Sequence, residues 1–256
     1  MTHPFVQARN HGGKQISVKR IVIHGTVSPC VKGGARGVAD DFHRTTRDAS
    51  AHYVVDPGQI VQCLTEQTIG FHAPPNTGSI GIELCDPQRG SSARWRDANH
   101  EAMLDLAAQL VREVAARWKV PLVKLSAGDL RAGRHGICGH VDVSHAFHRT
   151  DHIDPGTAFP WVHFMSLVTG KPAPKHDGTA PPFPGRLITQ PPAMRGDDVK
   201  TWQAQMRKRG ESIAVDGAYG PQSENVCRAF QKERNLGVDG VVGPQTWAVT
   251  FTAPIT

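Results

Sequence analysis

The sequence contains few aromatic residues and no long apolar segment. Phe, Trp and Tyr make up 6% of its 256 residues, and the 29 Lys and Arg residues are scattered instead of forming a block. Because nucleic-acid binding usually leaves a basic patch or a set of stacking aromatics, we expect no nucleic-acid partner, despite the net charge of +6. No apolar run approaches the roughly 20 residues that cross a bilayer, so we expect no stable membrane insertion.

The cysteines and the N-terminus also lack familiar patterns. Five cysteines are present, and no two of them have the CxxC spacing of a metal or redox motif: Cys30, Cys63, Cys85, Cys138 and Cys227. An odd number of scattered cysteines favours reduced, half-buried thiols, although one disulfide within the first domain remains an alternative. The opening residues, MTHPFVQARNHGGKQ, lack the charged-then-apolar layout of a signal peptide, so we expect synthesis in the cytoplasm.

Proline and histidine divide the chain into two parts. Residues 171–192 contain seven prolines, a composition that predicts an extended, semi-rigid linker. We therefore expect one domain over residues 1–170 and a second over residues 193–256. Of the 14 histidines, 13 precede this linker and His176 lies inside it, so any chemistry that needs imidazole belongs to the first domain.

The first domain mixes strand and helix patterns. The apolar runs KRIVIHGT (19–26) and SIGIELC (79–85) predict buried strands, and residues 51–64 predict a hairpin whose turn is Asp-Pro-Gly at 56–58. Apolar residues at helical spacing predict a helix over 99–118 with one buried stripe. This pattern indicates an α/β domain with a central mixed β-sheet flanked by helices.

The second domain repeats a short motif. VDGAYGPQS (215–223) and VDGVVGPQT (238–246) match, and in each an Asp-Gly turn precedes a Gly-Pro that opens a helix. We expect a small all-α three-helix bundle, with helices at 197–209, 221–235 and 244–252. Because residues 193–256 contain no histidine, binding is a more suitable function for this domain than catalysis.

The segment 136–156 is unusually rich in potential metal ligands. It contains four histidines and three aspartates. A catalytic zinc typically takes three protein ligands and leaves one position for water, and rigid elements distant in sequence must hold those ligands. His24, at the end of a predicted strand, is a suitable distant ligand. Within the segment we select His140, which follows a glycine, and Asp154, which precedes a Pro-Gly turn.

Most other histidines are expected to be ordinary solvated side chains, because a single histidine is more often solvated than a ligand. This interpretation covers His3, His11, His43, His100, His145, His148 and His163.

Glu83 is a second unusual residue, because it lies among apolar neighbours in SIGIELC. Alternation along a strand allows it to be an ordinary outward-facing residue. Alternatively, it is a carboxylate beside the metal that orients a water molecule and accepts its proton. The residue pattern alone does not separate these two interpretations.

Several motifs, in order, resemble those of a known family. IVIHGT, ASAHYVVD, GFHA, SIGIELC, GHVDVS and HIDPG are similar to the motifs of the type 2 N-acetylmuramoyl-L-alanine amidases, the zinc amidase family that includes the peptidoglycan recognition proteins. This resemblance covers about residues 18–165, and the tail resembles a peptidoglycan-binding domain with the repeated Asp-Gly…Gly-Pro pattern. Both resemblances imply bacterial peptidoglycan as the partner, and a monomer is the default expectation.

The resemblance implies a function for individual residues. The metal ligands of the family correspond to His24, His140 and Asp154, with Zn²⁺ as the cofactor, and its catalytic glutamate corresponds to Glu83. The family often has a lysine two residues before the aspartate ligand, where this chain has His152. A histidine there can stabilise a developing oxyanion only when its ring presents an N–H. The segment between the two later ligands is also a few residues longer than is common.

Two further histidines match family motif positions. His52 lies in ASAHYVVD and His72 lies in GFHA. The resemblance allows either residue to be structural or to line the substrate site, and we assign both to substrate binding as an expectation.

The implied reaction is hydrolysis of the amide between N-acetylmuramic acid and L-alanine. Without a signal peptide, such a two-domain enzyme resembles a phage endolysin, made in the host cytoplasm and acting on the cell wall after release. A cytosolic amidase of wall recycling is a competing interpretation, although it would have no use for a wall-binding domain.

Two other functions use the same residues differently. A zinc peptidase that cuts within the peptide stem would take His145 or His148 as a ligand. A non-catalytic peptidoglycan receptor typically lacks a metal ligand, whereas all three are present here.

Overall fold

The chain is described as a computed structural model, which covers residues 3–87, 92–156, 159–171, 180–234 and 236–253. The chain forms two compact units. The first comprises Met1–Pro160 and Phe164–Lys171, and the second comprises Trp161–His163 and Pro172–Thr256.

The first unit is built on a five-stranded sheet in the order β3-β2-β4-β1-β5. Its strands are β1 (Arg20–Gly25), β2 (Tyr53–Val55), β3 (Ile60–Gln62), β4 (Ser79–Leu84) and β5 (Gly136–Gly139). The β2–β3 hairpin is antiparallel, whereas β2–β4, β1–β4 and β1–β5 are parallel pairs. The expected central mixed sheet, its hairpin and its two buried strands are therefore confirmed.

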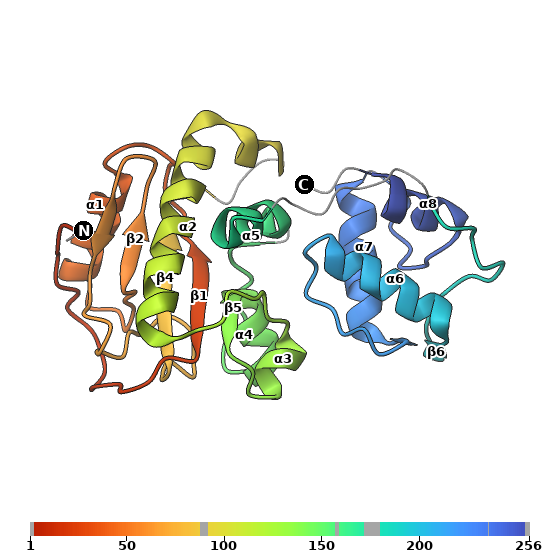
Figure 1. Cartoon of the computed structure of the whole chain (residues 1–256), viewed down its shortest axis with the longest axis horizontal. Coiled ribbons are helices and arrows are strands. Elements are labelled where there is room, and N and C mark those ends of the chain that lie inside the picture. The colour runs from red at the N-terminus through yellow and green to blue at the C-terminus, as the bar shows by residue number, and fades with distance from the viewer. Residues whose placement is uncertain (1–2, 88–91, 157–158, 172–179, 235, 254–256) are drawn as a thin grey trace. The chain divides into compact units, whose positions relative to one another are not determined.

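Helices accompany this sheet in the first unit (Figure 1). They are α1 (Gly34–Arg44), α2 (Ala98–Trp118), α3 (Ala127–Arg131) and α4 (His140–Phe147), with a short 3-10 turn at Ser92–Arg96. Helix α5 (Trp161–Thr169) contributes residues to both units.

Helix α2 confirms the helix predicted from the apolar stripe at 99–118. The Asp97 side chain caps its start by accepting the backbone N–H groups of Asn99 and His100. The helix packs on β2 and β4, and Figure 1 shows it covering one face of the sheet. The buried stripe includes Met103, Leu104, Ala107, Leu110, Val111 and Val114, all fully buried. Lys119, with φ of 56°, ends the helix in the left-handed region.

The central strands are apolar on both faces. Ile21, Val22 and Ile23 of β1 and Ile80 and Ile82 of β4 have no exposed surface. Such continuous apolar runs are typical of parallel strands that are covered on both sides. Each buried side chain contributes about 1.5–3 kcal/mol, so these two strands form a rigid base for the residues at their ends.

Over residues 180–234 and 236–253, the second unit contains three helices, as the sequence predicts. These are α6 (Asp197–Lys208), α7 (Pro221–Glu233) and α8 (Pro244–Thr252). A small two-stranded antiparallel sheet of β6 (Met194–Arg195) and β7 (Ala218–Tyr219) accompanies them. Strands of two residues are too short to produce a periodic pattern in the sequence, so this sheet was not expected.

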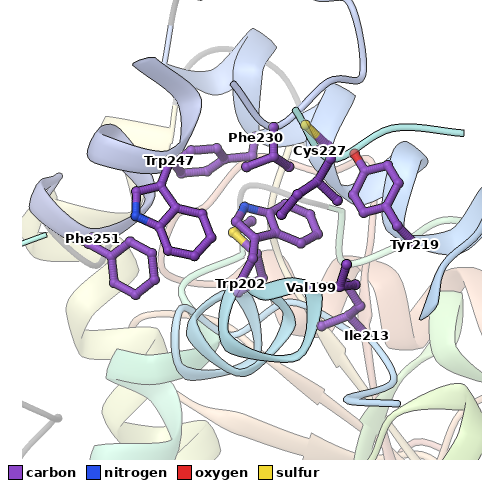
Figure 2. Close-up of a cluster of buried hydrophobic side chains, with 11 residues drawn as sticks. Val199, Trp202, Ile213, Tyr219, Cys227, Phe230, Trp247 and Phe251 are labelled. Atoms are coloured by element: carbon purple, nitrogen blue, oxygen red, sulfur yellow. The ribbon is translucent and has the colours of Figure 1, made fainter. Parts of the chain in front are cut away.

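Aromatic side chains from the three helices form the core of the second unit (Figure 2). Trp202 and Phe230 are buried between the helices, and Trp247 and Phe251 extend this core along α8. The cluster comprises Ile188, Val199, Trp202, Met206, Ile213, Tyr219, Cys227, Phe230, Val242, Trp247 and Phe251. Five of the eleven residues in this core are aromatic, and they supply much of the buried surface that a small unit needs.

The same kind of contact holds the Asp-Gly turn in both copies of the repeated motif. The Gln203 amide accepts the backbone N–H of Gly217 at 2.8 Å and donates to the Asp216 carboxylate at 2.9 Å. The Gln231 amide accepts the N–H of Gly240 at 2.9 Å and donates to the Asp239 carboxylate at 2.7 Å. Each turn is therefore held by a buried glutamine on the helix that precedes it.

The second half of the proline-rich segment differs from the expected free spacer. Ile188 is fully buried in the core of the second unit and forms an isolated β-bridge with Val242. Phe183 also packs against this core. A high proline content predicts an extended linker, but these apolar residues between the prolines pack against the second unit.

The cysteines and the apolar character of the helices were two further subjects of the sequence-based expectations. All five cysteines are free and buried, whereas half-buried thiols were expected. Among the described residues, no helix is long and apolar enough to cross a membrane.

Candidate metal centre

Parallel strand ends bring two chemically important residues together. His24 on β1 lies directly opposite Glu83 on β4 in the strand register. On the other side of β1, Ile23 pairs with Gly139, the last residue of β5, and His140 follows immediately as the first residue of α4. The carboxyl ends of parallel strands are the usual place for binding sites in α/β folds.

His24, His140 and Asp154 form the candidate metal-binding group. His24 Nδ1 lies 3.0 Å from Asp154 Oδ2, and His140 Nδ1 lies 3.2 Å from Asp154 Oδ1. One ligand atom from each residue lies within 4.8 Å of the others, and all three residues are buried. The structure therefore brings together the three residues selected from the sequence.

Backbone and side-chain bonds fix the segment that carries two of these residues. The Val141 N–H donates to the Asp154 carbonyl at 3.0 Å, and the Ser144 hydroxyl donates to the His152 carbonyl at 2.8 Å. Together these bonds hold the return loop against α4, which places Asp154 beside the start of the helix.

A buried carboxylate anchors the start of α4 itself. Asp142 Oδ2 accepts the Gly139 N–H at 2.8 Å and the Lys124 ammonium at 2.7 Å. Asp142 is one of the three aspartates in the ligand-rich segment, and its contacts show that its function is structural. It fixes the junction between β5 and α4 and thereby the position of His140.

The donor set suits zinc. Two imidazole nitrogens and a carboxylate are ordinary ligands of a catalytic zinc, which keeps its fourth position for water. Burial lowers the pKa of His24, and the neutral ring that results is the form that binds metal. His140 has a buried second nitrogen, Nε2, with no hydrogen-bond partner among the described residues. Burial alone would raise the pKa of Asp154, but its contacts with His140 and His24 hold that pKa below the usual range.

Glu83 is half-buried on β4, and its carboxyl group interacts electrostatically with that of Asp154. Burial, together with the nearby carboxylate of Asp154, raises the pKa of Glu83 to about 8. A strongly shifted carboxyl beside a candidate metal site is typical of a group that handles protons. A cation at the site would favour the charged carboxylate and lower this pKa.

His152 lies over the outer side of the candidate ligands. Its ring stacks on that of His140, with centroids 4.7 Å apart and planes inclined by 14°. Its Nδ1 lies 3.6 Å from Asp154 Oδ1, which is too far for a hydrogen bond, and 65% of its side chain is exposed. The ring is therefore accessible from solvent beside the ligands.

His52 and His72, expected to bind substrate, are both buried. His52 is fully buried, and its Nδ1 accepts the Gly81 N–H at 3.0 Å while its Nε2 lies 2.8 Å from the Thr68 carbonyl. His72 is 8% exposed and lies against His24. In His52 and in His72, both ring nitrogens therefore lie within hydrogen-bond distance of another group of the protein.

One histidine assigned to solvent is buried instead, which corrects the sequence analysis. His100 is 5% exposed, and its Nδ1 lies 2.8 Å from Asp97 Oδ2 while its Nε2 lies 3.2 Å from Asp86 Oδ1. The two carboxylates satisfy the ring, so burial is compatible with its polarity. By contrast, His145 and His148 are exposed, and neither belongs to the metal-binding group found among the described residues.

Known proteins match both parts of the chain. The amidase CwlL of Bacillus licheniformis is 26% identical over 92% of this chain and 66% of its own length. The amidase CwlH of Bacillus subtilis is 24% identical over 89% of this chain and 87% of its own length. Both are N-acetylmuramoyl-L-alanine amidases. The chain spans about two thirds of the length of the former relative.

The fold agrees with that of a solved hydrolase. The structure of Staphylococcus aureus AmiA in complex with its ligand has a TM-score of 0.52 and 16% identity, and the match covers 68% of this chain and 88% of that one. Residues 195–249 match a peptidoglycan binding domain. Residues 14–157, more than half of the chain, match N-acetylmuramoyl-L-alanine amidase. The chain therefore belongs to the N-acetylmuramoyl-L-alanine amidase family, as the resemblance of its motifs indicated.

Proposed function

We propose that this chain is a zinc-dependent amidase that hydrolyses the bond between N-acetylmuramic acid and L-alanine in bacterial peptidoglycan. The observation that carries the proposal is the convergence of His24, His140 and Asp154 beside Glu83 at the strand ends. Membership of the amidase family supports the reaction, and the second match supports peptidoglycan as the partner.

His24, His140 and Asp154 would hold the zinc ion. When bound, zinc supplies a Lewis acid that lowers the pKa of a water molecule to about 7 and polarises the scissile carbonyl. The three ligands are buried and fixed by β1, α4 and the return loop, so they keep their geometry without substrate.

Glu83 would act as the proton acceptor and donor. Its carboxylate takes a proton from the attacking water and returns it to the amine of L-alanine as the amide bond breaks. The strand register supports this assignment, because it places Glu83 directly opposite the ligand His24. An ordinary outward-facing residue would not need the buried surroundings that raise the pKa of Glu83.

His152 would stabilise the oxygen that gains charge during attack. Its exposed ring lies beside the candidate ligands and can present an N–H to that oxygen. A histidine provides this N–H in either neutral tautomer, although only one nitrogen carries it, so the orientation of the ring decides its contribution.

The second unit would bind the wall and concentrate the catalytic unit there. Linking a binding module to an enzyme raises the local concentration of substrate without new contacts in the catalytic site. Such an arrangement suits an enzyme that degrades intact wall, as a phage endolysin does after its release from the host cytoplasm, and it has no use in recycling small fragments.

Digestion of purified sacculi tests the proposed reaction. The amidase should release peptides with new L-alanine amino termini and leave glycan without peptide, both detectable by mass spectrometry. A metal chelator should stop the release. Alanine that remains attached to the sugar would instead identify a stem peptidase, and binding without any release would identify a non-catalytic receptor.

A further inference from the structure

The candidate ligand His24 needs a hydrogen-bond acceptor on the side of its ring that faces away from Asp154. Its Nδ1 is the atom beside the carboxylate, so a metal at this group would take the Nδ1 lone pair. A neutral imidazole then carries its proton on Nε2. Metal-bound histidines almost always donate this second N–H to a partner that fixes the ring.

His72 supplies that acceptor. Its Nδ1 lies 3.0 Å from His24 Nε2, and the two rings are perpendicular, with centroids 5.1 Å apart. To accept this hydrogen bond, His72 must carry its own proton on Nε2. That nitrogen lies 3.1 Å from the hydroxyl oxygen of Ser79, the first residue of β4.

Ser79 sets the direction of the whole chain of hydrogen bonds. The single proton of its hydroxyl is donated to the Asn76 carbonyl at 2.6 Å. Because a carbonyl can only accept, the Ser79 oxygen is left to accept from His72 Nε2. The hydrogen bonds therefore run from His24 through His72 and Ser79 to Asn76, and this direction leaves His24 Nδ1 with a free lone pair.

The surroundings hold the His72 ring in one orientation. A Cβ atom built on Gly81 of β4 would lie 2.6 Å from His72 Cγ, so the ring rests directly on the strand backbone. The Asn76 side chain accepts the backbone N–H groups of His72 and Ala73 at 3.1 and 2.8 Å. His72 is consequently packed from several sides and is nearly inaccessible to substrate.

We propose that His72 and Ser79 are positioning residues for the metal ligand His24: they fix its tautomer and ring orientation so that Nδ1 faces the metal. This inference rests on the zinc site in the proposed function. It replaces the expectation that His72 binds substrate, and it explains why Ser79 and Gly81 interrupt the apolar residues of β4.

Zinc affinity, measured on the full chain by competition with a fluorescent chelator, tests this proposal directly. We expect Ser79→Ala and His72→Leu to weaken zinc binding by about 10–100-fold, the usual effect of removing such a partner. His72→Asn keeps an acceptor near the position of Nδ1, so it should retain more affinity than His72→Leu. Ser223→Ala is the matched control, because it removes a buried hydroxyl from the second unit and should leave zinc binding unchanged.

The tautomer of His24 provides a second measurement. Nitrogen-15 spectra of the zinc-loaded protein should show that the ring proton of His24 is on Nε2. In His72→Leu, the chemical shift of this Nε2–H group should move to the value of a group without a hydrogen bond. Folded variants that bind zinc as the unmodified chain does, or His72→Asn and His72→Leu of equal affinity, would overturn the proposal. Failure of the unmodified chain to bind zinc at all would contradict the proposed function instead, so the two failures are distinguishable.

Discussion

His24 and Glu83 lie opposite each other on two parallel strands, β1 and β4, at the carboxyl edge of the sheet. Because both strands are fully buried over their preceding residues, neither side chain can move relative to the other without disturbing the core. The candidate ligand and the candidate proton acceptor are therefore placed by the sheet. The other two ligands come from the start of α4, which carries His140, and from the return loop, which carries Asp154.

Replacement of Glu83 by glutamine should separate catalysis from metal binding. The amide keeps the size of the side chain but cannot accept a proton, so turnover should fall by about 10²–10⁴-fold, the usual contribution of a general base. The zinc content should stay at the level of the unmodified chain. Rates of peptide release together with metal analysis give both values, and a near-normal rate would remove Glu83 from the reaction.

Removal of the carboxylate ligand should remove the metal. Asp154→Ala leaves only His24 and His140, and we expect zinc to dissociate and peptide release to cease. Asp151→Asn is the control, because Asp151 is exposed in the same loop and should not affect zinc content. In the unmodified chain, chelation should stop the reaction and added zinc should restore it. Full activity after thorough chelation would contradict a metal-dependent mechanism.

The sequence predicted the elements that have strong periodic patterns. Helix α2 has an apolar stripe at helical spacing, and strands β1 and β4 have short apolar runs. The structure reproduces all three elements within a residue or two. The residues selected as ligands follow from composition, since His140 and Asp154 lie in a segment dense in histidine and aspartate. His24 lies at a strand end, where binding residues are expected.

The remaining features depend on contacts that no local pattern encodes. The bond between His72 and His24 joins residues that are 48 positions apart, and it depends on the path of the loop before β4. A serine and a glycine in the apolar strand β4 were the available signals for it. His100 was assigned to solvent because a single histidine is more often solvated than buried. Its burial depends on Asp97 at the start of the same helix and on Asp86, which lies 14 positions earlier.

His100 should make the stability of the first unit depend on pH. Burial alone would lower its pKa, but hydrogen bonds with Asp86, Cys30 and Asp97 outweigh burial and raise that pKa to about 10. Because the pKa is higher in the folded chain than the ordinary value of about 6.5, protonated His100 stabilises the fold fully below pH 6.5. This contribution is lost as pH rises from about 6.5 to about 10.

Thermal unfolding of the unmodified chain and of His100→Gln checks this dependence. The difference in melting temperature should be largest below pH 6.5 and should shrink toward pH 10. A difference that stays constant over this range would show that the ring is neutral in the folded chain.

The two glutamines that hold the Asp-Gly turns should contribute equally to the second unit. Gln203→Leu and Gln231→Leu each leave a turn N–H and a carboxylate without their buried partner, and each should destabilise the unit by about 1–3 kcal/mol. Gln245→Leu, at an exposed position of α8, is the control. Calorimetry of the full chain should show a lower unfolding temperature of the second unit in Gln203→Leu and Gln231→Leu, but not in Gln245→Leu. Unequal losses would mean that the two copies of the motif are not structurally equivalent.

The close approach of the His72 ring to Gly81 has a consequence for genetic screens. Any side chain at position 81 would displace the imidazole, although Gly81 is not a candidate metal ligand and lies in the middle of the sheet. Loss-of-function alleles should therefore appear at this glycine as readily as at a ligand, and they would yield folded protein depleted of zinc.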